Sequence, residues 1–309
     1  MLLTLAPGLF MPWTLSIPEG DELGFVTTTH ERNLYRGTID DALVLVCRQV
    51  DDFAIATASP DTAEKLIAII NKHATTTSKG IGVKDEQGIG LRYNGIDIHQ
   101  TRDYTKLSCE TYIERVLQTH GWEKPTANES DRFDAVPLPV DSVETLLKDT
   151  GPSEGSKEHR ELEEKVGFGY RTLLGELMYA FVVCRLDIGF AVTLLARFST
   201  CPSRSHYMAL KSVTRYLRRT KDWGLIYWRQ APIDSLPAVP LEHLPIDDSL
   251  PSYPSHDLLQ LVGQVDAAHA TDLSTRRSVT GLVFSLAGGA IAYKSKLQTT
   301  VATSSTEAE

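Results

Sequence analysis

Two short aliphatic runs, separated by a Val-Asp-Asp tripeptide, constrain the fold of this chain more than any other feature. The first run is Ala42–Cys47 and the second is Phe53–Ala56. Runs of this length and β-branched content favour buried strands, and the short polar interruption favours a tight turn. We therefore predict an antiparallel hairpin that carries Asp51 and Asp52 at its tip.

The residues that follow the hairpin continue a mixed α/β pattern. A helix is expected to begin at Ser59, where a capping serine, a proline and an acid follow one another. A second hairpin is predicted, with Gly90–His99 running out and Tyr104–Ser108 returning. The next predicted helix, Glu110–His120, ends at a glycine, Gly121, which is a common C-terminal signal.

The middle of the chain reads as a loop followed by a helical block. Residues 124–158 are rich in Pro, Asp, Glu and Ser, and only Ser142–Lys148 has the pattern of a short helix. Apolar residues then recur at helical spacing from about Leu162 to Thr220, and Pro202-Ser203 is expected to open one of these helices.

A proline-rich spacer separates this block from a β-rich end. Residues 231–256 contain six prolines and no Lys or Arg, which favours a semi-extended linker. Three strand-like runs follow, namely Leu259–Val265, Ser278–Ser285 and Ala290–Lys294. The cap residues Ser304-Ser305 and the acid after them predict the start of a helix.

Charge and cysteine content exclude several classes of protein. The 31 basic and 40 acidic residues give a net charge of −9, so the chain is not a uniformly basic nucleic-acid binder. The four cysteines are far apart and form no CxxC pair, which disfavours a disulfide scaffold or a zinc finger and favours reduced thiols.

The sequence predicts no membrane segment and no signal peptide. No apolar run reaches the roughly 18–20 residues that a membrane helix needs. The apolar start, Met1–Trp13, has no positive charge before it and contains two prolines. An intracellular location is expected, with the compartment and the oligomeric state left open.

Adjacent carboxylates at a hairpin tip are suited to divalent cations. Asp51 and Asp52 would repel each other unless cations neutralise them, and Mg²⁺ prefers hard oxygen ligands while keeping waters for substrate phosphates. Two-metal phosphoryl transfer uses such an arrangement. The alternative is an ordinary solvated turn, because Asp is common in turns.

The wider sequence resembles the polyprotein of copia-type retrotransposons over roughly residues 22–309. The segments that carry the resemblance are LVCRQVDDFAIA (45–56), NGIDIHQ (94–100), YIERVL (112–117), YRTLLGELMYAFVVCRLD (170–187), SVTRYLRRTKDWGLIY (212–227) and the run from Arg276 that ends in SSTEAE (276–309). The resemblance implies an α/β (α+β) chain made of a partial reverse-transcriptase palm with an antiparallel sheet, a helical thumb and connection, and a partial ribonuclease H-like mixed sheet.

The resemblance also implies a domain organisation and a set of site residues. Residues 1–123 would be the partial palm, 124–158 a connector, 159–229 the thumb and connection, 230–258 a linker, and 259–309 the first part of ribonuclease H. The implied catalytic residues and Mg²⁺ ligands are Asp51, Asp52, Asp266 and Glu309. A template–primer duplex of RNA and DNA and nucleoside triphosphates are the implied partners.

Several positions depart from the family pattern. Gln49 stands where the family usually has an aromatic residue before Val-Asp-Asp, and Ala268 and His269 replace an acid and an aromatic after Asp266. No acid before residue 41 follows a strand-like run that could supply the third polymerase carboxylate. We read the chain as truncated, and we expect His269 to be structural or exposed and not a catalytic base.

A basic, aromatic-rich segment is the third candidate site. Between Arg197 and Arg229 the chain has eight basic residues and one acid. The expected duplex-binding residues, several of which share one side of a helix, are Arg204, Lys211, Arg215, Arg218 and Arg219. The alternative is a solvated helix face whose interleaved aromatic residues belong to the core.

The sequence therefore supports three hypotheses about function. The first is a fragment of a retrotransposon RNA-directed DNA polymerase with the start of ribonuclease H, which uses two metal ions in its family and is inactive by itself. The second is a non-catalytic nucleic-acid-binding module. The third is an unstable relic of a decayed element.

Overall fold

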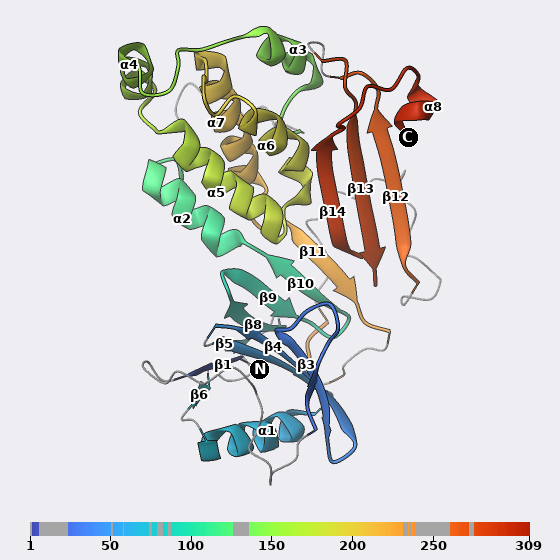
Figure 1. Ribbon diagram of the computed structural model, residues 1–309. Coiled ribbons are helices and arrows are strands. Elements are labelled where there is room, and N and C mark those ends of the chain that lie inside the picture. Colours follow the sequence, from blue (N-terminus) through green and yellow to red (C-terminus); the bar gives the residue numbers. More distant parts are fainter. Residues whose placement is uncertain are drawn as a thin grey trace. The chain divides into compact units, whose positions relative to one another are not determined.

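A computed structural model describes most of the chain, which divides into two compact units, Met1–His99 and Gln100–Glu309 (Figure 1). The described residues are 2–5, 24–50, 52–57, 59–73, 76–78, 83–85, 88–125, 136–230, 234, 236–238, 260–271 and 275–309. Both units combine helices with antiparallel strands, so the predicted mixed α/β class is confirmed. No helix in these ranges has both the length and the apolar character needed to span a bilayer.

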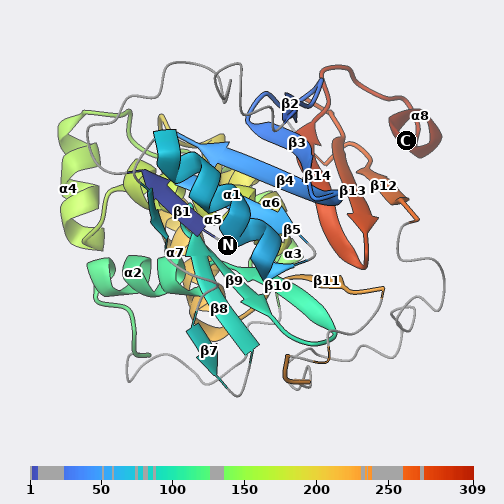
Figure 2. The same cartoon turned by 90° about the horizontal axis from the view of Figure 1, so that it is seen from below.

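The first unit is built on a six-stranded sheet with the order β2-β3-β4-β5-β1-β6. Its elements are β1 (Leu2–Leu5), β2 (Val26–Thr27), β3 (Leu34–Ile39), β4 (Ala42–Gln49), β5 (Asp52–Thr57), α1 (Pro60–His73) and β6 (Thr76–Ser78). Seen from below in Figure 2, α1 lies across the strands of this sheet. Alternating residues of β4 and β5, among them Val46 and Ile55, are buried with Leu66 of α1, which gives the unit its own core.

The remaining strands of the first unit correct one prediction. The segment Gly90–His99, expected as one strand, is two strands, β8 (Gly88–Tyr93) and β9 (Ile96–Gln100). Asn94 and Gly95 form the turn between them, with φ of 49° and 77°. An Asn-Gly pair tolerates positive φ at both positions and is a strong hairpin signal, so the local sequence does contain the turn. A short strand, β7 (Val83–Asp85), pairs with β8.

Helices form the centre of the second unit. They are α2 (Glu110–His120), α3 (Val140–Lys148), α4 (Lys157–Val166), α5 (Tyr170–Val183), the 3₁₀ turn η1 (Leu186–Ile188), α6 (Gly189–Ala196) and α7 (Arg204–Arg219). Gly121 ends α2 in the left-handed conformation, with φ of 66°, as predicted. The helices share one core, in which Tyr170, Leu195 and Leu210 are almost completely buried.

Strands complete the second unit. β10 (Tyr104–Ser108) pairs antiparallel with β11 (Gly224–Trp228). The predicted C-terminal strands are present as β12 (Val262–Ala268), β13 (Val279–Leu286) and β14 (Gly289–Leu297), in a sheet of that order. The short helix α8 (Ser305–Ala308) follows, and the Ser304 side chain caps it by accepting from the Glu307 backbone N–H, as the sequence predicts.

Tyrosine hydroxyls join the three-stranded sheet to the helices. The Tyr293 hydroxyl of β14 donates to the carbonyls of Phe181 and Val182 at the end of α5, at 2.6 and 2.8 Å. The Tyr227 hydroxyl of β11 donates to the Ala290 carbonyl at 2.6 Å. Burial raises the pKa of Tyr293 to about 12, so this hydroxyl keeps its proton and remains a donor at neutral pH.

Candidate functional site

The predicted acidic hairpin is present in the first unit. Gln49, the last residue of β4, pairs with Asp52, the first residue of β5, so a two-residue turn connects the strands. Val50 occupies this turn with φ of 57° and an exposed side chain. Asp51 lies outside the described residues.

Asp52 faces away from the core of its sheet. Strand alternation places it with Ala54 on the face opposite Phe53 and Ile55, which are buried against α1. The Asp52 side chain is partly buried there. The candidate carboxylate therefore belongs to the face of β4 and β5 that α1 does not cover.

Tyr93 is a neighbour of this site that the sequence analysis missed. Its hydroxyl donates to the Cys47 carbonyl of β4 at 3.3 Å. Burial raises the pKa of Tyr93, and the nearby Asp52 carboxylate adds to the shift. The sequence does contain a signal for the place of Tyr93 in the fold. Tyr93 directly precedes the Asn-Gly turn, and that turn folds β8 and β9 into a hairpin.

Asp266 lies on β12, on the sheet face that is turned toward the helices. It pairs with Gly281 of β13, which pairs with Ser295 of β14, so the three residues form a row across one face. The Ser295 hydroxyl accepts a long hydrogen bond of 3.4 Å from Thr193 of α6. Asp266 itself remains exposed.

Glu309 directly follows α8, which lies beside the C-terminal end of β12 (Figure 1). The ring of His269, just beyond β12, donates from Nε2 to the Ala302 carbonyl at 3.2 Å and so links the two segments. This contact supports the structural interpretation of His269. The structure thus places the strand of Asp266 and the helix before Glu309 at the same end of the sheet.

The described residues do not by themselves make a metal site. Among them, no three His, Cys, Asp or Glu side chains gather closely enough to hold an ion. Carboxylate oxygens are suitable magnesium ligands, but Asp52 has only the undescribed Asp51 as its acidic neighbour in sequence.

The candidate basic residues on α7 have varied surroundings. Arg204 is exposed, whereas Arg215 and Arg219 are partly buried, and the Arg215 guanidinium donates to Ser212 Oγ at 2.9 Å. The guanidinium of Arg218 donates to the backbone carbonyls of Trp122 and Lys124, at 3.2 and 3.4 Å.

The aromatic residues interleaved with these basic residues are largely structural. The Lys211 ammonium lies 5.2 Å from the centre of the Trp122 ring. Tyr207 and Tyr216 are buried in the core and do not form an exposed stacking surface. Part of the basic segment therefore holds the second unit together.

A second polar cluster, not identified from the sequence, surrounds Arg185. Its side chain is 1% exposed and donates to both carboxylate oxygens of Asp187, at 3.0 and 2.7 Å. It also donates to the Thr220 carbonyl at 2.7 Å and hydroxyl at 2.6 Å. The Tyr216 hydroxyl completes the cluster by donating to Asp187 at 2.9 Å. The cluster fixes η1 against the end of α7.

Ser and His side chains at the start of α7 meet Asp149, which follows α3, but their arrangement is that of a helix cap. Asp149 accepts hydrogen bonds from the hydroxyls of Ser203 and Ser205. His206 Nδ1 accepts from the Ser203 backbone N–H at 2.9 Å, and its Nε2 donates to the Leu146 carbonyl at 2.9 Å. In a nucleophilic triad the acid orients the histidine, whereas here a carbonyl does so. We assign this cluster to stability.

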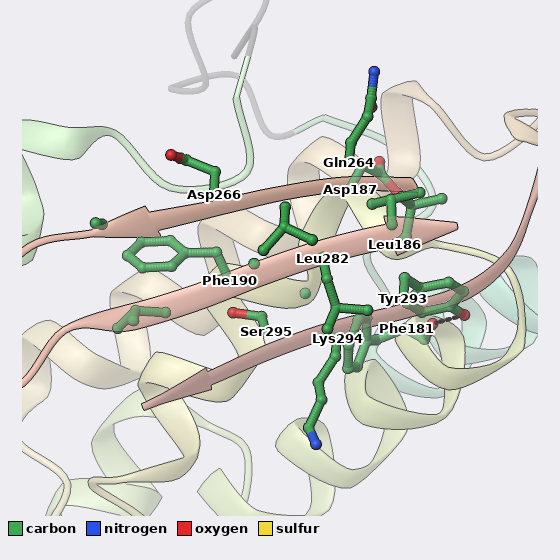
Figure 3. A pocket seen from close by; sticks show the side chains of 16 residues that line it. Phe181, Leu186, Asp187, Phe190, Gln264, Asp266, Leu282, Tyr293, Lys294 and Ser295 are labelled. Atoms are coloured by element: carbon green, nitrogen blue, oxygen red, sulfur yellow. Dashed lines mark hydrogen bonds between the residues drawn. The ribbon is translucent and has the colours of Figure 1, made fainter. Parts of the chain in front are cut away.

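A cavity of about 400 Å³ lies between the three-stranded sheet and the helices of the second unit (Figure 3). Its apolar walls include Phe181 of α5, Phe190 of α6 and Val283 of β13. Asp266 and Gln264 of β12 also line it. One candidate site residue therefore borders an apolar space as well as solvent.

Comparison with known proteins yields several relatives. No family model and no solved structure matches the chain. The chain is 32% identical over 246 residues, 78% of its length, to the retrovirus-related Pol polyprotein from transposon TNT 1-94 of Nicotiana tabacum. It is 25% identical over 291 residues to a putative transposon Ty5-1 protein of Saccharomyces cerevisiae, which covers 93% of the chain and 77% of that protein. It is also 36% identical over 140 residues, 45% of its length, to secreted RxLR effector protein 161 of Plasmopara viticola, of which the match covers 80%.

Transposon-encoded proteins thus recur among the relatives. The match to the Ty5-1 protein covers most of this chain and most of that protein. The chain belongs to the retrovirus-related Pol polyproteins of retrotransposons. It spans only 15% of the tobacco polyprotein.

Proposed function

We propose that the chain is part of a copia-type RNA-directed DNA polymerase joined to the start of ribonuclease H, and that it is inactive as an isolated polypeptide. The observation that carries the proposal is the β4–β5 hairpin, with Asp52 beside its two-residue turn, inside a chain related to Pol polyproteins. The helix α1 and the β8–β9 hairpin follow it in the order that the resemblance to a palm implies.

In this proposal the carboxylates belong to two sites. Asp51 and Asp52 would hold Mg²⁺ in the polymerase part, and Asp266 and Glu309 would hold it in the ribonuclease H part. At the polymerase site the metal ions would supply activation of a primer 3′ hydroxyl and stabilisation of the leaving pyrophosphate. The shared location of β12 and α8 at one end of their sheet supports the second pair.

The expected inactivity follows from the number of carboxylates that are available to hold metal ions. Two-metal transfer needs a cluster of carboxylates, and no three metal-binding side chains gather among the described residues. Contrary to the expectation from the sequence, an acid before residue 41 does follow a strand, because Asp40 comes directly after β3. It lies at the other end of β4 from Asp52, since Ile39 pairs with Ala42 and Gln49 pairs with Asp52, and its carboxylate pairs with Lys65. The isolated chain is therefore expected to lack the third carboxylate of the polymerase site.

Primer extension tests this proposal directly. The purified chain, supplied with an RNA template, a DNA primer, nucleoside triphosphates and Mg²⁺ or Mn²⁺, should give no extended product. A parallel assay with a labelled RNA–DNA hybrid should show no cleavage. Template-dependent extension that disappears in Asp52→Asn would overturn the claim of inactivity while supporting the assigned site.

A second candidate function is non-catalytic binding of a nucleic-acid duplex. One observation favours it, namely the excess of basic residues between Arg197 and Arg229. Phosphate contacts by basic side chains would supply affinity without base specificity.

The structure suggests how to test binding without disturbing the core. Arg204 is exposed and Arg219 is partly buried, whereas Arg218 and Lys211 contact Trp122. Arg204→Glu combined with Arg219→Glu should weaken binding of an RNA–DNA duplex and lower the salt slope by roughly 0.9 for each lost phosphate contact. Lys157→Glu combined with Lys165→Glu, two exposed residues of α4, is the control with the same total charge change. No binding by the unaltered chain at low salt would contradict this function.

A further inference from the structure

The cavity between the β12–β14 sheet and the helices has apolar walls that the proposed function does not use, although Asp266, which also lines it, is one of the two acids assigned there to Mg²⁺. Its volume of about 400 Å³ falls within the range of about 300–1,000 Å³ that is usual for small-molecule pockets. Hydrogen bonds connect the sheet to the helices beside the cavity. The Tyr293 hydroxyl donates to a carbonyl at the end of α5, and Thr193 of α6 donates to Ser295. The space thus lies between elements that are bonded to each other.

Three aromatic rings contribute to the cavity wall. Phe181 and Tyr293 contact each other with ring centres 5.5 Å apart, and Phe190 of α6 lines the same space. Gly281 of β13 also lines the cavity. A Cβ added at Gly281 would meet no atom closer than the Asp266 carbonyl oxygen, 4.0 Å away, so the sheet leaves open space at this position.

The charge balance of the lining favours a cation. No hydrogen bond or ion pair from the described residues reaches the side chains of Asp266 or Gln264. The second acid, Asp187, is already neutralised by Arg185. Lys294 alternates with the inward residues Tyr293 and Ser295, and Figure 3 shows its side chain extending away from Asp266. Within the described residues, Asp266 is therefore a carboxylate without a charged partner, beside an apolar space lined in part by aromatic rings.

We propose that this cavity binds a small organic ammonium ion with an apolar body. The apolar body would replace water against Phe190, Phe181 and Val283, and the ammonium group would pair with Asp266 and face the aromatic rings. An anion of the same shape would be repelled by Asp266, and a neutral analogue would forgo the charge pairing.

Three probes with the same phenylethyl body test the proposal by titration calorimetry on the full chain. They are 2-phenylethylammonium, 2-phenylethanol and 3-phenylpropionate, which share a phenyl body and differ in charge. We expect the ammonium to bind at least about tenfold more tightly than the alcohol, which corresponds to about 1.4 kcal/mol, and we expect no measurable binding of the carboxylate.

Two variants separate the role of the charge from the role of the space. Asp266→Asn should remove the preference for the ammonium while leaving weak binding of the alcohol, and Gly281→Leu should fill the cavity and abolish binding of both the ammonium and the alcohol. Glu164→Gln on α4, an exposed acid outside the cavity, is the matched control and should bind like the unaltered chain.

Specific outcomes would overturn the proposal. Equal affinity for the ammonium and the alcohol, an ammonium preference that persists in Asp266→Asn, or no binding of any probe would each do so. A melting curve for each variant shows whether it is folded, and the conservative Asp266→Asn change keeps the test informative if Gly281→Leu unfolds. Probe binding is measured independently of primer extension. The ligand-site proposal and the polymerase proposal can therefore fail separately.

Discussion

Arg185 shows how one buried charge organises the helical block at the scale of single residues. Its guanidinium is almost fully removed from water, but its hydrogen bonds go to two partners that accept them, Asp187 and Thr220. Removing one partner of such a pair is costly, because the remaining charge stays buried without compensation.

We predict that Asp187→Asn destabilises the folded chain by about 3 kcal/mol. Asp187 keeps 29% of its side chain exposed, so this value lies at the lower end for buried pairs. Urea unfolding followed by circular dichroism measures the change. Glu144→Gln, which breaks the exposed pair with Lys148, is the control and should leave the midpoint unchanged. Equal midpoints for both variants would show that the Arg185 cluster is dispensable.

Gly281 offers the opposite kind of substitution. An added Cβ would meet open space, and the backbone φ is not positive, so alanine fits without strain. Gly281→Ala should therefore stabilise the chain by about 0.4–1 kcal/mol, because alanine restricts the unfolded state. Gly224→Ala should do the reverse, since its Cβ would lie 2.2 Å from the Leu107 carbonyl oxygen. Thermal melts of both variants test the pair, and destabilisation by Gly281→Ala would be inconsistent with the open space.

At the scale of elements, the start of α7 depends on a neutral histidine. Burial lowers the pKa of His206, partly opposed by the Leu146 carbonyl and by Asp149. The unfolded chain therefore binds this proton more tightly than the folded one. The contribution of His206 to stability is complete above the ordinary histidine pKa of about 6.5 and is lost as the pH falls below it toward the lowered value.

This linkage predicts that the stability of the wild type depends more strongly on pH than the stability of His206→Asn. An Asn side-chain oxygen can still accept from the Ser203 N–H, but it does not titrate. The melting temperature of the wild type should therefore fall more steeply between pH 7 and pH 5 than that of the variant. Parallel pH profiles would show that His206 does not titrate in this way.

The same elements show what the sequence could and could not predict. The β4–β5 hairpin and the ends of α2 and α8 were predictable, because their signals are local, such as β-branched runs, Gly121 and the Ser304 cap. The split of Gly90–His99 was also encoded locally, by Asn94-Gly95, but was missed.

Contacts between segments that are far apart in the sequence had no local sequence signal. Arg218 reaches the carbonyl of Trp122, and Tyr293 reaches the end of α5, only after the helices and the sheet have assembled. The cavity beside Asp266 has the same origin, because its walls come from α5, α6 and the sheet. Neither spacing nor composition along the chain reports such pairs, so these parts of the candidate sites could not be predicted.

At the scale of the whole molecule, each unit has a hydrophobic core of its own. The core of Met1–His99 includes Leu66 on α1, and that of Gln100–Glu309 includes Leu210 on α7. Both leucines are at most 2% exposed. Truncating such a residue to alanine costs about 2–5 kcal/mol, through lost burial and the cavity left behind.

Separate cores predict separate unfolding transitions. In urea unfolding followed by hydrogen exchange and mass spectrometry, Leu66→Ala should lower the midpoint for peptides of the first unit, and Leu210→Ala should lower it for peptides of the second. Each variant should leave the other midpoint nearly in place, because a core substitution acts on the cooperative unit that contains it. If both variants shift all peptides together, the two cores unfold as one cooperative structure and the division into two units has no thermodynamic counterpart.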